Sequence, residues 1–264
     1  MLEPRKPIQY VQIDSTEFKP VHASVIVETP VSLTVNGEVW VSFMCTSVLL
    51  EAMAVGFLFN EGVIESMDEV SDVRVCEHGD NVDVWLTHAA DKPTKWTRTS
   101  GCTGGQTAVD SFADPRPAAP SNGFVLPASQ INRLVEMLFE AQDLYRETGG
   151  VHTSVLTDGE RVLLSAEDIG RHNTLDKIAG LCLMQGLWPE RRILVTTGRI
   201  SSEMLQKAAR LGAKIIVSRT SPSSLSIELA EKWGVTLIGY ARRNRFNLYA
   251  HPERIMAADE QPAK

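Results

Sequence analysis

The sequence predicts an α/β protein with a β-rich N-terminal part and a largely parallel sheet in its C-terminal half. From residue 151 onward, apolar strands alternate with amphipathic helices of about ten residues, the pattern of βαβ crossovers. In the first third, two extended runs flank Asn36-Gly37, a pair typical of tight β-hairpins. The 264 residues, 43% of them hydrophobic, suffice for a sizeable core. We predict two parts, residues 1–126 and 127–264.

The N-terminal part contains a hairpin, a helix and a second pair of strands. The hairpin is ASVIVETPVSLTVNGEVWVSFMC, with its turn at Asn36-Gly37. A helix is predicted over residues 47–64, because apolar residues recur at helical spacing, and Gly62 is a suitable stop. DVRVCEHG and NVDVWLTH then alternate like paired strands.

A connector rich in Pro, Ala and Gly, FADPRPAAPSNGFVLP, separates the two parts and has little periodic pattern. The next segment, residues 128–150, is predicted to form one amphipathic helix that ends at Gly149-Gly150. The sequence from residue 151 then predicts a hairpin that turns at Asp158-Gly159. Helices and strands alternate after it, in the segments 172–186, 192–198, 201–212, 214–219, 223–234 and 235–241.

Charge and composition exclude several classes of protein. The formal net charge is −7, which disfavours general binding to nucleic acid or to anionic membranes. The N-terminal residues have no apolar core typical of a signal peptide, and no apolar run approaches the ~18 residues of a membrane span. We therefore expect a cytoplasmic protein. Its four cysteines are scattered, without a CxxC pair, which argues against a zinc ribbon or a disulfide framework.

One cysteine has unusual neighbours. Cys102 lies in TRTSGCTGGQTAVD, where Gly101, Gly104 and Gly105 leave its sulfur open to approach. A thiol near the N-terminus of a helix ionises more easily, and the thiolate is the reactive form. The segment is therefore either a site of reactive sulfur or a glycine-rich turn that happens to contain a cysteine.

Two strand-to-helix loops, VTTGRISSE and VSRTSPSSLS, follow neighbouring strands of the predicted sheet. Ligands bind at the carboxyl ends of strands in such sheets, and Arg199 and Arg219 lie there. Free N–H groups at the helix starts suit phosphate oxygens, although a serine before a helix is more often a simple N-cap. The candidate caps are Ser201, Ser202, Ser221 and Ser223.

Three arginines, Arg242, Arg243 and Arg245, crowd the end of the last predicted parallel strand. A guanidinium group binds phosphate through two parallel hydrogen bonds, so this cluster could hold phosphate in an otherwise acidic protein. A solvated charged turn is the alternative.

The segment AEDIGRHNTLDK concentrates acid, base and amide side chains around a glycine. It could form an acid/base cluster, or Asp168 could cap the next helix while His172 is hydrogen-bonded within it. A zinc site is improbable because no PCxxC follows, and no GxSxG motif supports a serine hydrolase. No role is assigned to His152 or His251. The residues that could form this cluster are Glu167, Asp168, Arg171, His172 and Asp176.

Several of these motifs together resemble the formate dehydrogenase accessory sulfurtransferase family (FdhD). The motifs are TSGCTGG, ETGGVHTSVL, AEDIGRHNTLDKIAG, TTGRISSEMLQKAARLG, SRTSPSSLSIELAEKWGVTLIGYAR and LYAHPERI. The stretch from Met53 to Ile64 fits the family as well. The resemblance covers roughly residues 22–255 and preserves the order of the motifs.

The resemblance implies a cytidine-deaminase-like layered fold without zinc, and a sulfur carrier. Such a protein accepts sulfur from a cysteine desulfurase as a persulfide, which the resemblance places on Cys102. It passes the sulfur to molybdenum-bis(molybdopterin guanine dinucleotide), or its tungsten counterpart, before this cofactor enters formate dehydrogenase. The resemblance alone also implies a homodimer. The residues that match the cofactor-binding loop are Tyr240, Ala241, Arg242, Arg243, Asn244 and Arg245.

The chain departs from the family pattern at one position. Some members carry CxxC at the reactive site, whereas Gly105 occupies the second position here. One thiol can in principle accept and release sulfur, but a step that needs a second thiol is in doubt. A delivery chaperone that binds the cofactor without sulfur transfer therefore remains an alternative, and a nucleoside deaminase relative is a remote one. The other cysteines, Cys45, Cys76 and Cys182, are expected to be buried.

Overall fold

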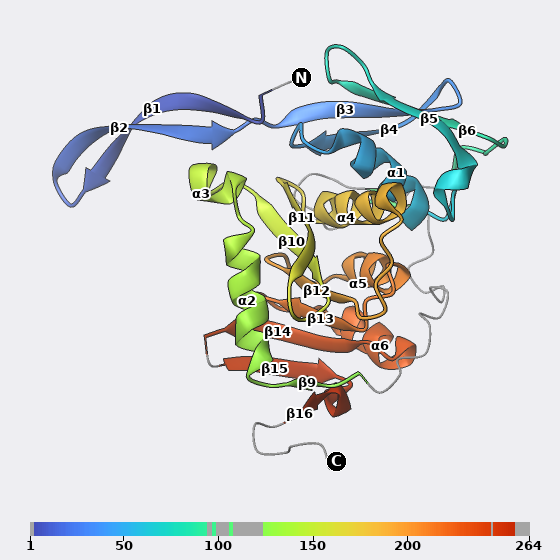
Figure 1. Ribbon diagram of the computed structural model, residues 1–264. Helices are drawn as coiled ribbons and strands as arrows, with labels where there is room; N and C mark the ends of the chain where they lie inside the picture. Colours follow the sequence, from blue (N-terminus) through green and yellow to red (C-terminus); the bar gives the residue numbers. More distant parts are fainter. Residues whose placement is uncertain (1–2, 94–96, 99–105, 108–123, 244, 257–264) are drawn as a thin grey trace.

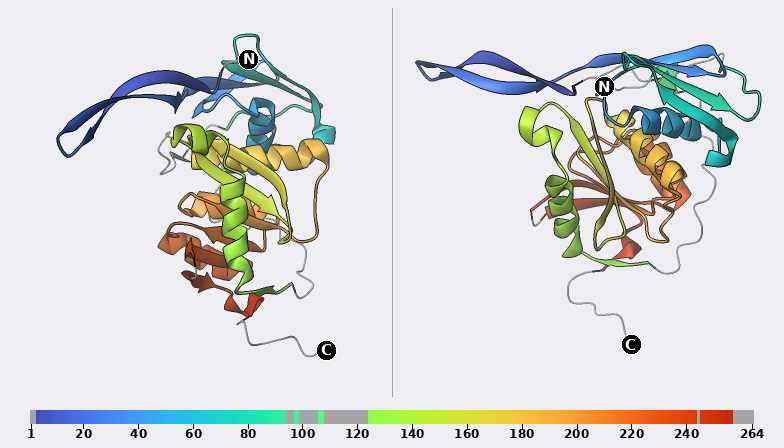
Figure 2. Two further views of the ribbon diagram at one scale, coloured as in Figure 1. Left: turned by 60° about the vertical axis from the view of Figure 1, so that its left-hand side comes forward. Right: turned by 45° about the horizontal axis from the view of Figure 1, so that its top comes forward.

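The computed structural model describes residues 3–93, 97–98, 106–107, 124–243 and 245–256. Two main sheets and the helices between and beside them form successive layers (Figures 1 and 2). No helix in the described part of the chain is long and apolar enough to cross a membrane. The α/β class predicted from the sequence is confirmed, with parallel strands at the centre of the larger sheet.

The N-terminal sheet has four strands in the order β4-β3-β6-β5. Its predicted first hairpin is confirmed, because Asn36 and Gly37 both adopt positive φ angles (50° and 87°) in the turn between β3 and β4. β3 and β6 run parallel, and the other pairs are antiparallel. The strands are β3 (Thr29–Val35), β4 (Glu38–Cys45), β5 (Val70–Val75) and β6 (Asn81–Leu86).

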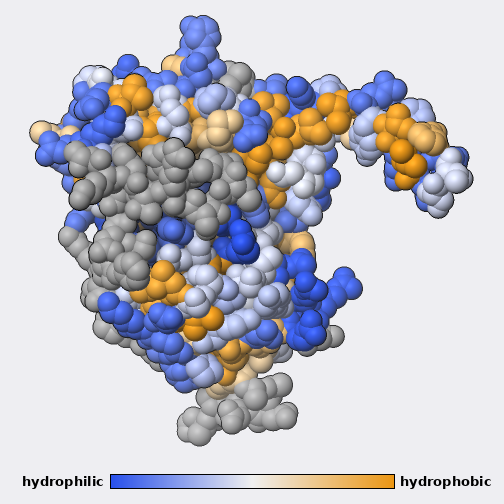
Figure 3. All heavy atoms as spheres, turned by 180° about the vertical axis from the view of Figure 1, so that it is seen from behind, coloured by the Kyte–Doolittle hydropathy of each residue, from blue (hydrophilic) through white to orange (hydrophobic). Residues whose placement is uncertain are grey.

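A two-stranded antiparallel ribbon, β1 (Arg5–Asp14) and β2 (Glu17–Ile26), projects from this sheet away from the body (Figure 1). Apolar side chains are exposed along it (Figure 3), among them Phe18, which is 68% exposed. Only the base of the ribbon contacts the body, where Arg5 forms an ion pair with Glu147. The sequence analysis assigned no strand to the outer part of this ribbon.

The helices α1 (Leu50–Asn60) and α4 (Arg171–Gln185) join the two halves of the chain, and they cross in close contact. Gly56 faces the backbone of α4, and Gly180 faces that of α1; a Cβ atom at either glycine would lie 1.8 Å from a carbonyl oxygen. Glycine is therefore required at the crossing. One apolar core extends from the N-terminal sheet through α1 and α4 to the larger sheet. The predicted boundary after residue 126 stays a prediction.

The larger sheet has six strands in the order β11-β10-β12-β13-β14-β15. β12, β13 and β14 are parallel to one another, whereas β10, β11 and β15 pair antiparallel at the two sides. The hairpin between β10 and β11 turns at the predicted Asp158-Gly159. The strands are β10 (His152–Thr157), β11 (Val162–Asp168), β12 (Ile193–Thr196), β13 (Ile215–Ser218), β14 (Thr236–Arg242) and β15 (Arg245–Ala250).

Both faces of this sheet are covered, which explains its nearly continuous apolar strands. Alternate residues of one strand, such as Leu194 and Val195, belong to separate core clusters on the two faces. α4 lies with α5 (Ser202–Arg210) and α6 (Ser224–Trp233) on one face, and α2 (Gln130–Glu140) covers the other (Figure 2).

The single helix predicted over residues 128–150 is two helices, α2 and α3 (Leu144–Thr148). The break arises because the carboxylate of Glu167 accepts hydrogen bonds from the N–H groups of Asp143, Leu144 and Tyr145, at 2.6–3.1 Å. Because these N–H groups donate to Glu167 and not to carbonyl groups of α2, α2 ends and α3 begins. The remaining short elements are η1 (Met67–Glu69), β7 (Thr97–Arg98), β8 (Gln106–Thr107), β9 (Leu126–Pro127), η2 (Pro252–Arg254) and β16 (Ile255–Met256).

Candidate functional site

The carboxyl ends of the parallel strands β12, β13 and β14 meet at one edge of the larger sheet, as the sequence pattern predicts. Two cavities open there, beside α2 and α3. The larger has a volume of about 660 Å³ and the smaller about 520 Å³. Both fall in the size range of small-molecule sites. Phe139, Arg219 and Arg242 line both cavities, so the two are neighbours that share one wall.

The shared wall is built around Arg219. Its guanidinium carbon lies 4.5 Å from the centroid of the Phe139 ring, a stacked cation–π arrangement that fixes the side chain. Its Nε is buried and has no hydrogen-bond partner among the described residues. A buried donor without a partner is costly, so this atom does not explain the position of the side chain. Arg219 lines both cavities, and a guanidinium group there can meet a phosphate or a similar anion.

The predicted cofactor-binding loop is partly in the site. Arg242 and Arg243 line the larger cavity. Tyr240 is 40% exposed with a positive φ of 51°, and its N–H donates to the carbonyl of Thr220 at 3.0 Å, which ties the loop to the end of β13. Ala241 is fully buried in the core under α2.

The rest of the loop contributes less to the cavities. Arg245 is exposed and pairs with Arg242 across the β14–β15 hairpin, but it is absent from the lining of both cavities. Asn244 lies outside the described residues. Of the predicted cofactor-binding loop, Arg242 and Arg243 therefore line the larger cavity together. Arg219 from the neighbouring strand-end loop lines it with them.

Cys102 lies outside the described residues, as do the glycines that flank it, so its reactive role stays a prediction. Among the other cysteines, Cys45 and Cys182 are fully buried, and burial raises their pKa values to about 12 and about 11. Their thiols remain protonated at neutral pH and are poor nucleophiles. The expectation of burial is wrong for Cys76, which is partly exposed and donates to the Asp80 carboxylate at 3.0 Å.

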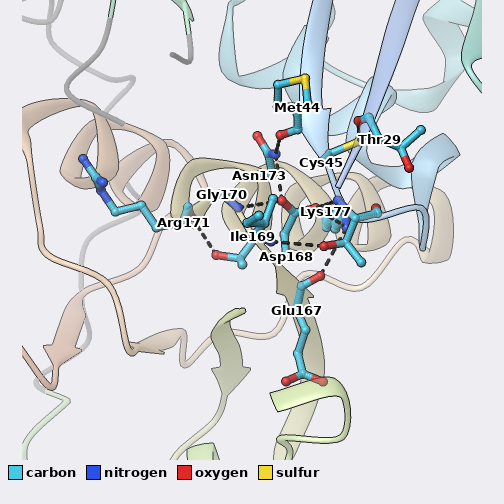
Figure 4. Close-up of polar contacts among 12 residues, drawn as sticks. Thr29, Met44, Cys45, Glu167, Asp168, Ile169, Gly170, Arg171, Asn173 and Lys177 are labelled. Atoms are coloured by element: carbon cyan, nitrogen blue, oxygen red, sulfur yellow. Dashed lines mark hydrogen bonds and ion pairs between the residues drawn. The ribbon is translucent and has the colours of Figure 1, made fainter. Parts of the chain in front are cut away.

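Asp168 has a structural role, because its carboxylate is held in a buried hydrogen-bond network (Figure 4). It is fully buried, and its carboxylate accepts hydrogen bonds from the N–H groups of Thr46 and Gly170, at 3.0 and 2.7 Å. It also accepts from the side chains of Asn173 and Lys177, at 2.8 and 2.5 Å. All of its oxygens are thus occupied in holding α4 against the β4–α1 connection. Asp168 holds the residues before α4 but does not cap the helix, because the N-cap position is Gly170; the acid/base interpretation does not fit either.

Glu167 also holds structure, because it caps α3 and accepts the hydroxyl of Thr153 at 3.2 Å. In Figure 4 its carboxylate points away from the Asp168 network, toward α3. Tyr145 of α3 and Gly149, which follows the helix, line the smaller cavity, so Glu167 positions a wall of that cavity.

The histidine of the same motif lines neither cavity. His172 is buried with Nε2 3.4 Å from the hydroxyl of Ser201, and burial, reinforced by the charge of Lys207, lowers its pKa well below the usual value. Asp176 is buried and accepts two hydrogen bonds from Lys207, each 2.7 Å long. The motif therefore supports packing between helices and provides no proton-transfer pair in either cavity.

His152 lines the smaller cavity, although no sequence pattern assigned it a role. Its Nδ1 is 3.2 Å from the hydroxyl of Thr197, at the end of β12. Burial, followed by the positive charges of Arg171 and Arg199, lowers its pKa. It therefore presents a neutral imidazole to the cavity at neutral pH, beside the hydroxyls of Thr197 and Thr220.

The serines of the two strand-end loops act as helix caps. Ser201 accepts a hydrogen bond from the N–H of Met204, and Ser223 accepts one from the N–H of Ser226. The simpler interpretation of these residues is therefore the right one. Each cap thus satisfies one of the N–H groups in the first turn of its helix.

The family model described as the FdhD/NarQ family matches residues 26–256, almost the whole described chain. The chain belongs to the FdhD/NarQ family. This confirms the resemblance inferred from the motifs.

Relatives in the FdhD/NarQ family are similar to this chain along most of their length. A protein named sulfur carrier protein FdhD from Bacillus subtilis (strain 168) is 36% identical over 244 residues, covering 90% of this chain and 93% of that protein. One of the same name from Staphylococcus aureus (strain MRSA252) is 34% identical and covers 89% and 90%. A crystal structure described as a formate dehydrogenase accessory protein from Desulfotalea psychrophila has a TM-score of 0.77 and 30% identity, covering 96% and 100%.

Sequence reasoning missed the contribution of α2 to the site. Asn132, Val135, Glu136 and Phe139 share one side of this helix and line the larger cavity. A usable signal was present: Phe139 is an apolar residue outside the buried stripe of an amphipathic helix, and it is 41% exposed.

Proposed function

We propose that this chain is a sulfur carrier that matures formate dehydrogenase. It takes sulfur from a cysteine desulfurase as a persulfide on Cys102 and transfers it to molybdenum-bis(molybdopterin guanine dinucleotide) or its tungsten counterpart. Family membership supports the carrier role, since relatives at 34–36% identity bear that name. The observation that carries the cofactor assignment is the convergence of Arg219, Arg242 and Arg243 on one cavity at the strand ends.

The residues of this site suit a dinucleotide substrate. The protein has a formal net charge of −7, so a cavity with three arginines is a local exception that favours an anion. Arg219 lines both cavities, so its guanidinium group can bind phosphate from either one. The neighbouring smaller cavity, with the hydroxyls of Thr197 and Thr220, gives room for the remainder of an elongated ligand.

The loading step requires one thiolate on the acceptor. The Cys102 thiolate attacks the terminal sulfur of the donor persulfide, the donor's S–S bond breaks, and the donor cysteine leaves as a thiolate. A new S–S bond then joins that sulfur to Cys102. No second thiol takes part in this exchange, so Gly105 in place of a cysteine does not prevent it.

Intact-mass measurement tests the carrier role directly. After incubation with a cysteine desulfurase and cysteine, the protein should gain the mass of one sulfur atom, and a thiol reductant should remove it. A protein that binds guanine nucleotides but never gains sulfur would be a delivery chaperone instead. The proposal also includes a homodimer, on the resemblance alone, and a cytoplasmic location, on the sequence pattern of the N-terminal residues.

Removal of the cavity arginines should separate cofactor binding from sulfur loading. We expect Arg242→Ala to weaken GDP binding by about 1.5–3 kcal/mol, or about ten- to a hundredfold, because a charge-assisted contact to phosphate is lost. The combined change of Arg242, Arg243 and Arg245 to alanine should abolish measurable binding yet leave Cys102 loading intact. Titration calorimetry at two salt concentrations measures the first effect, which added salt should reduce.

Arg245→Ala is the matched control, because this residue belongs to the same hairpin but does not line the cavity. It should change GDP affinity less than Arg242→Ala does. Unchanged affinity in the triple variant would move the phosphate site away from the β14–β15 turn and leave that turn a solvated charged loop.

A further inference from the structure

The larger cavity contains one feature that a phosphate site alone does not explain. Glu136 lines it together with Arg219, Arg242 and Arg243, and it is the only carboxylate among the described residues that line either cavity. A carboxylate repels phosphate, so its presence weakens the anion site that the arginines create. A ligand group that donates hydrogen bonds would make the carboxylate favourable.

Glu136 is available for such a ligand. Its recorded partner is Arg133, whose Nη1 lies 3.4 Å from Oε2, whereas Arg133 makes shorter contacts of 2.8 and 3.3 Å with Glu140. Glu136 therefore has the looser contact of the two acids. Its side chain is 64% exposed, so a ligand that enters the cavity can reach it.

Neighbouring groups in the cavity suit a flat ring. Phe139 and Glu136 lie three residues apart on α2, so both side chains lie on the same side of the helix. Arg219 covers one face of the Phe139 ring, and the ring is 41% exposed, so a base can stack on the part that Arg219 leaves open. The cavity thus combines a stacking surface with an acceptor of hydrogen bonds.

Guanine and adenine differ in what they offer such a carboxylate. The Watson–Crick edge of guanine presents N1–H and N2–H₂ as adjacent donors, which match the two oxygens of a carboxylate. Adenine presents an acceptor nitrogen at the corresponding position, which a carboxylate repels. We propose that Glu136 recognises the Watson–Crick edge of guanine in the larger cavity and makes the chain selective for guanine over adenine nucleotides.

This assignment rests on the proposed function, because it requires a guanine nucleotide whose phosphates bind Arg219 and Arg242. It also orients the ligand. The smaller cavity has no carboxylate among its described lining residues and offers His152, Thr197 and Thr220, so it accommodates the part of the ligand beyond the phosphates. The base then lies beside α2.

Calorimetric titration of the full chain with GDP, IDP and ADP tests the proposal. IDP lacks the N2 amino group, so the wild-type protein should bind it about tenfold more weakly than GDP, and ADP more weakly still. Glu136→Gln should lower GDP affinity about tenfold or more, because the amide replaces one acceptor with a donor. It should also reduce the difference between GDP and IDP.

The sign of the change separates recognition from simple electrostatics. Removing a negative charge beside three arginines should, on electrostatic grounds alone, strengthen the binding of all three diphosphates. Weaker GDP binding with unchanged or stronger ADP binding therefore supports a specific contact. Uniformly stronger binding in Glu136→Gln would overturn the proposal.

Glu140→Gln is the matched control. Glu140 is on the same helix, pairs with the same Arg133 and is 62% exposed, but it does not line the cavity. It should leave GDP affinity and the preference for GDP over IDP unchanged; equal losses in both variants would overturn the proposal. If the wild-type protein binds no GDP at all, the dinucleotide site of the proposed function fails first, and this assignment fails with it.

Discussion

Cys102→Ser is expected to abolish persulfide formation and the maturation of formate dehydrogenase while the protein remains folded. A hydroxyl cannot accept sulfur from a persulfide, because the acceptor must be a thiolate. The substitution exchanges one atom in a glycine-rich segment, so we expect the fold to be retained. Intact-mass analysis after desulfurase treatment measures loading, and thermal unfolding checks the fold. Persulfide on the serine variant would contradict the carrier assignment.

The other three cysteines serve as controls because they differ in solvent exposure. Cys76→Ala is the most informative of these controls, because this thiol is partly exposed and could compete with Cys102 for sulfur from the desulfurase. We expect it to load normally, as should alanine variants of the buried Cys45 and Cys182, although these two could lose about 1–3 kcal/mol of stability. A folded Cys76→Ala protein that no longer loads would reveal a relay between two thiols and would restore a two-cysteine mechanism.

Gly180→Ala should be strongly destabilising, as should the equivalent change of Gly56 at the same helix crossing. A Cβ at Gly180 would lie 1.8 Å from the carbonyl oxygen of Ala52 and 2.5 Å from the carbonyl carbon, so the backbones of α1 and α4 would have to separate. Overpacking of this kind costs about 1–3 kcal/mol when side chains give way, and more when only backbone can move. We expect a loss of more than about 3 kcal/mol, measured by chemical denaturation.

Gly186→Ala, one residue beyond the same helix, is its control. A Cβ at Gly186 meets nothing within 4 Å, but its backbone is left-handed, with φ at 61°. Alanine there should cost about 1–2 kcal/mol through backbone strain alone. A Gly180→Ala protein as stable as Gly186→Ala would contradict the close crossing of the helices.

Local patterns in the sequence predicted most elements of the fold. Asn36-Gly37 and Asp158-Gly159 determine their turns through backbone conformation, and the strands of the larger sheet are recognisable because both of its faces are covered. The break between α2 and α3 was not predictable in this way. It depends on Glu167, whose position next to Asp143 exists only in the folded chain.

The candidate site was predictable only in part, for the same reason. Arg242 and Arg243 stand out as a cluster in the sequence, and Arg219 was noticed only as one arginine in a strand-end loop. Their convergence with Phe139 follows from the packing of α2 against the sheet. Conversely, Asp168 looked chemically active in the sequence, and the folded protein occupies all of its hydrogen-bonding capacity.

The β1–β2 ribbon is a long arm that meets the body beside the wall of the smaller cavity. Its ten paired residues extend about 33 Å at the usual rise per residue, and it is attached to the body at one end only. At that end Arg5 is paired with Glu147 of α3, and Ile26 lies against Gly150, which lines the cavity. A rotation of about 10° at the base would therefore move the tip by about 6 Å. A spectroscopic label near Asp14 would register small movements of α3 as large displacements.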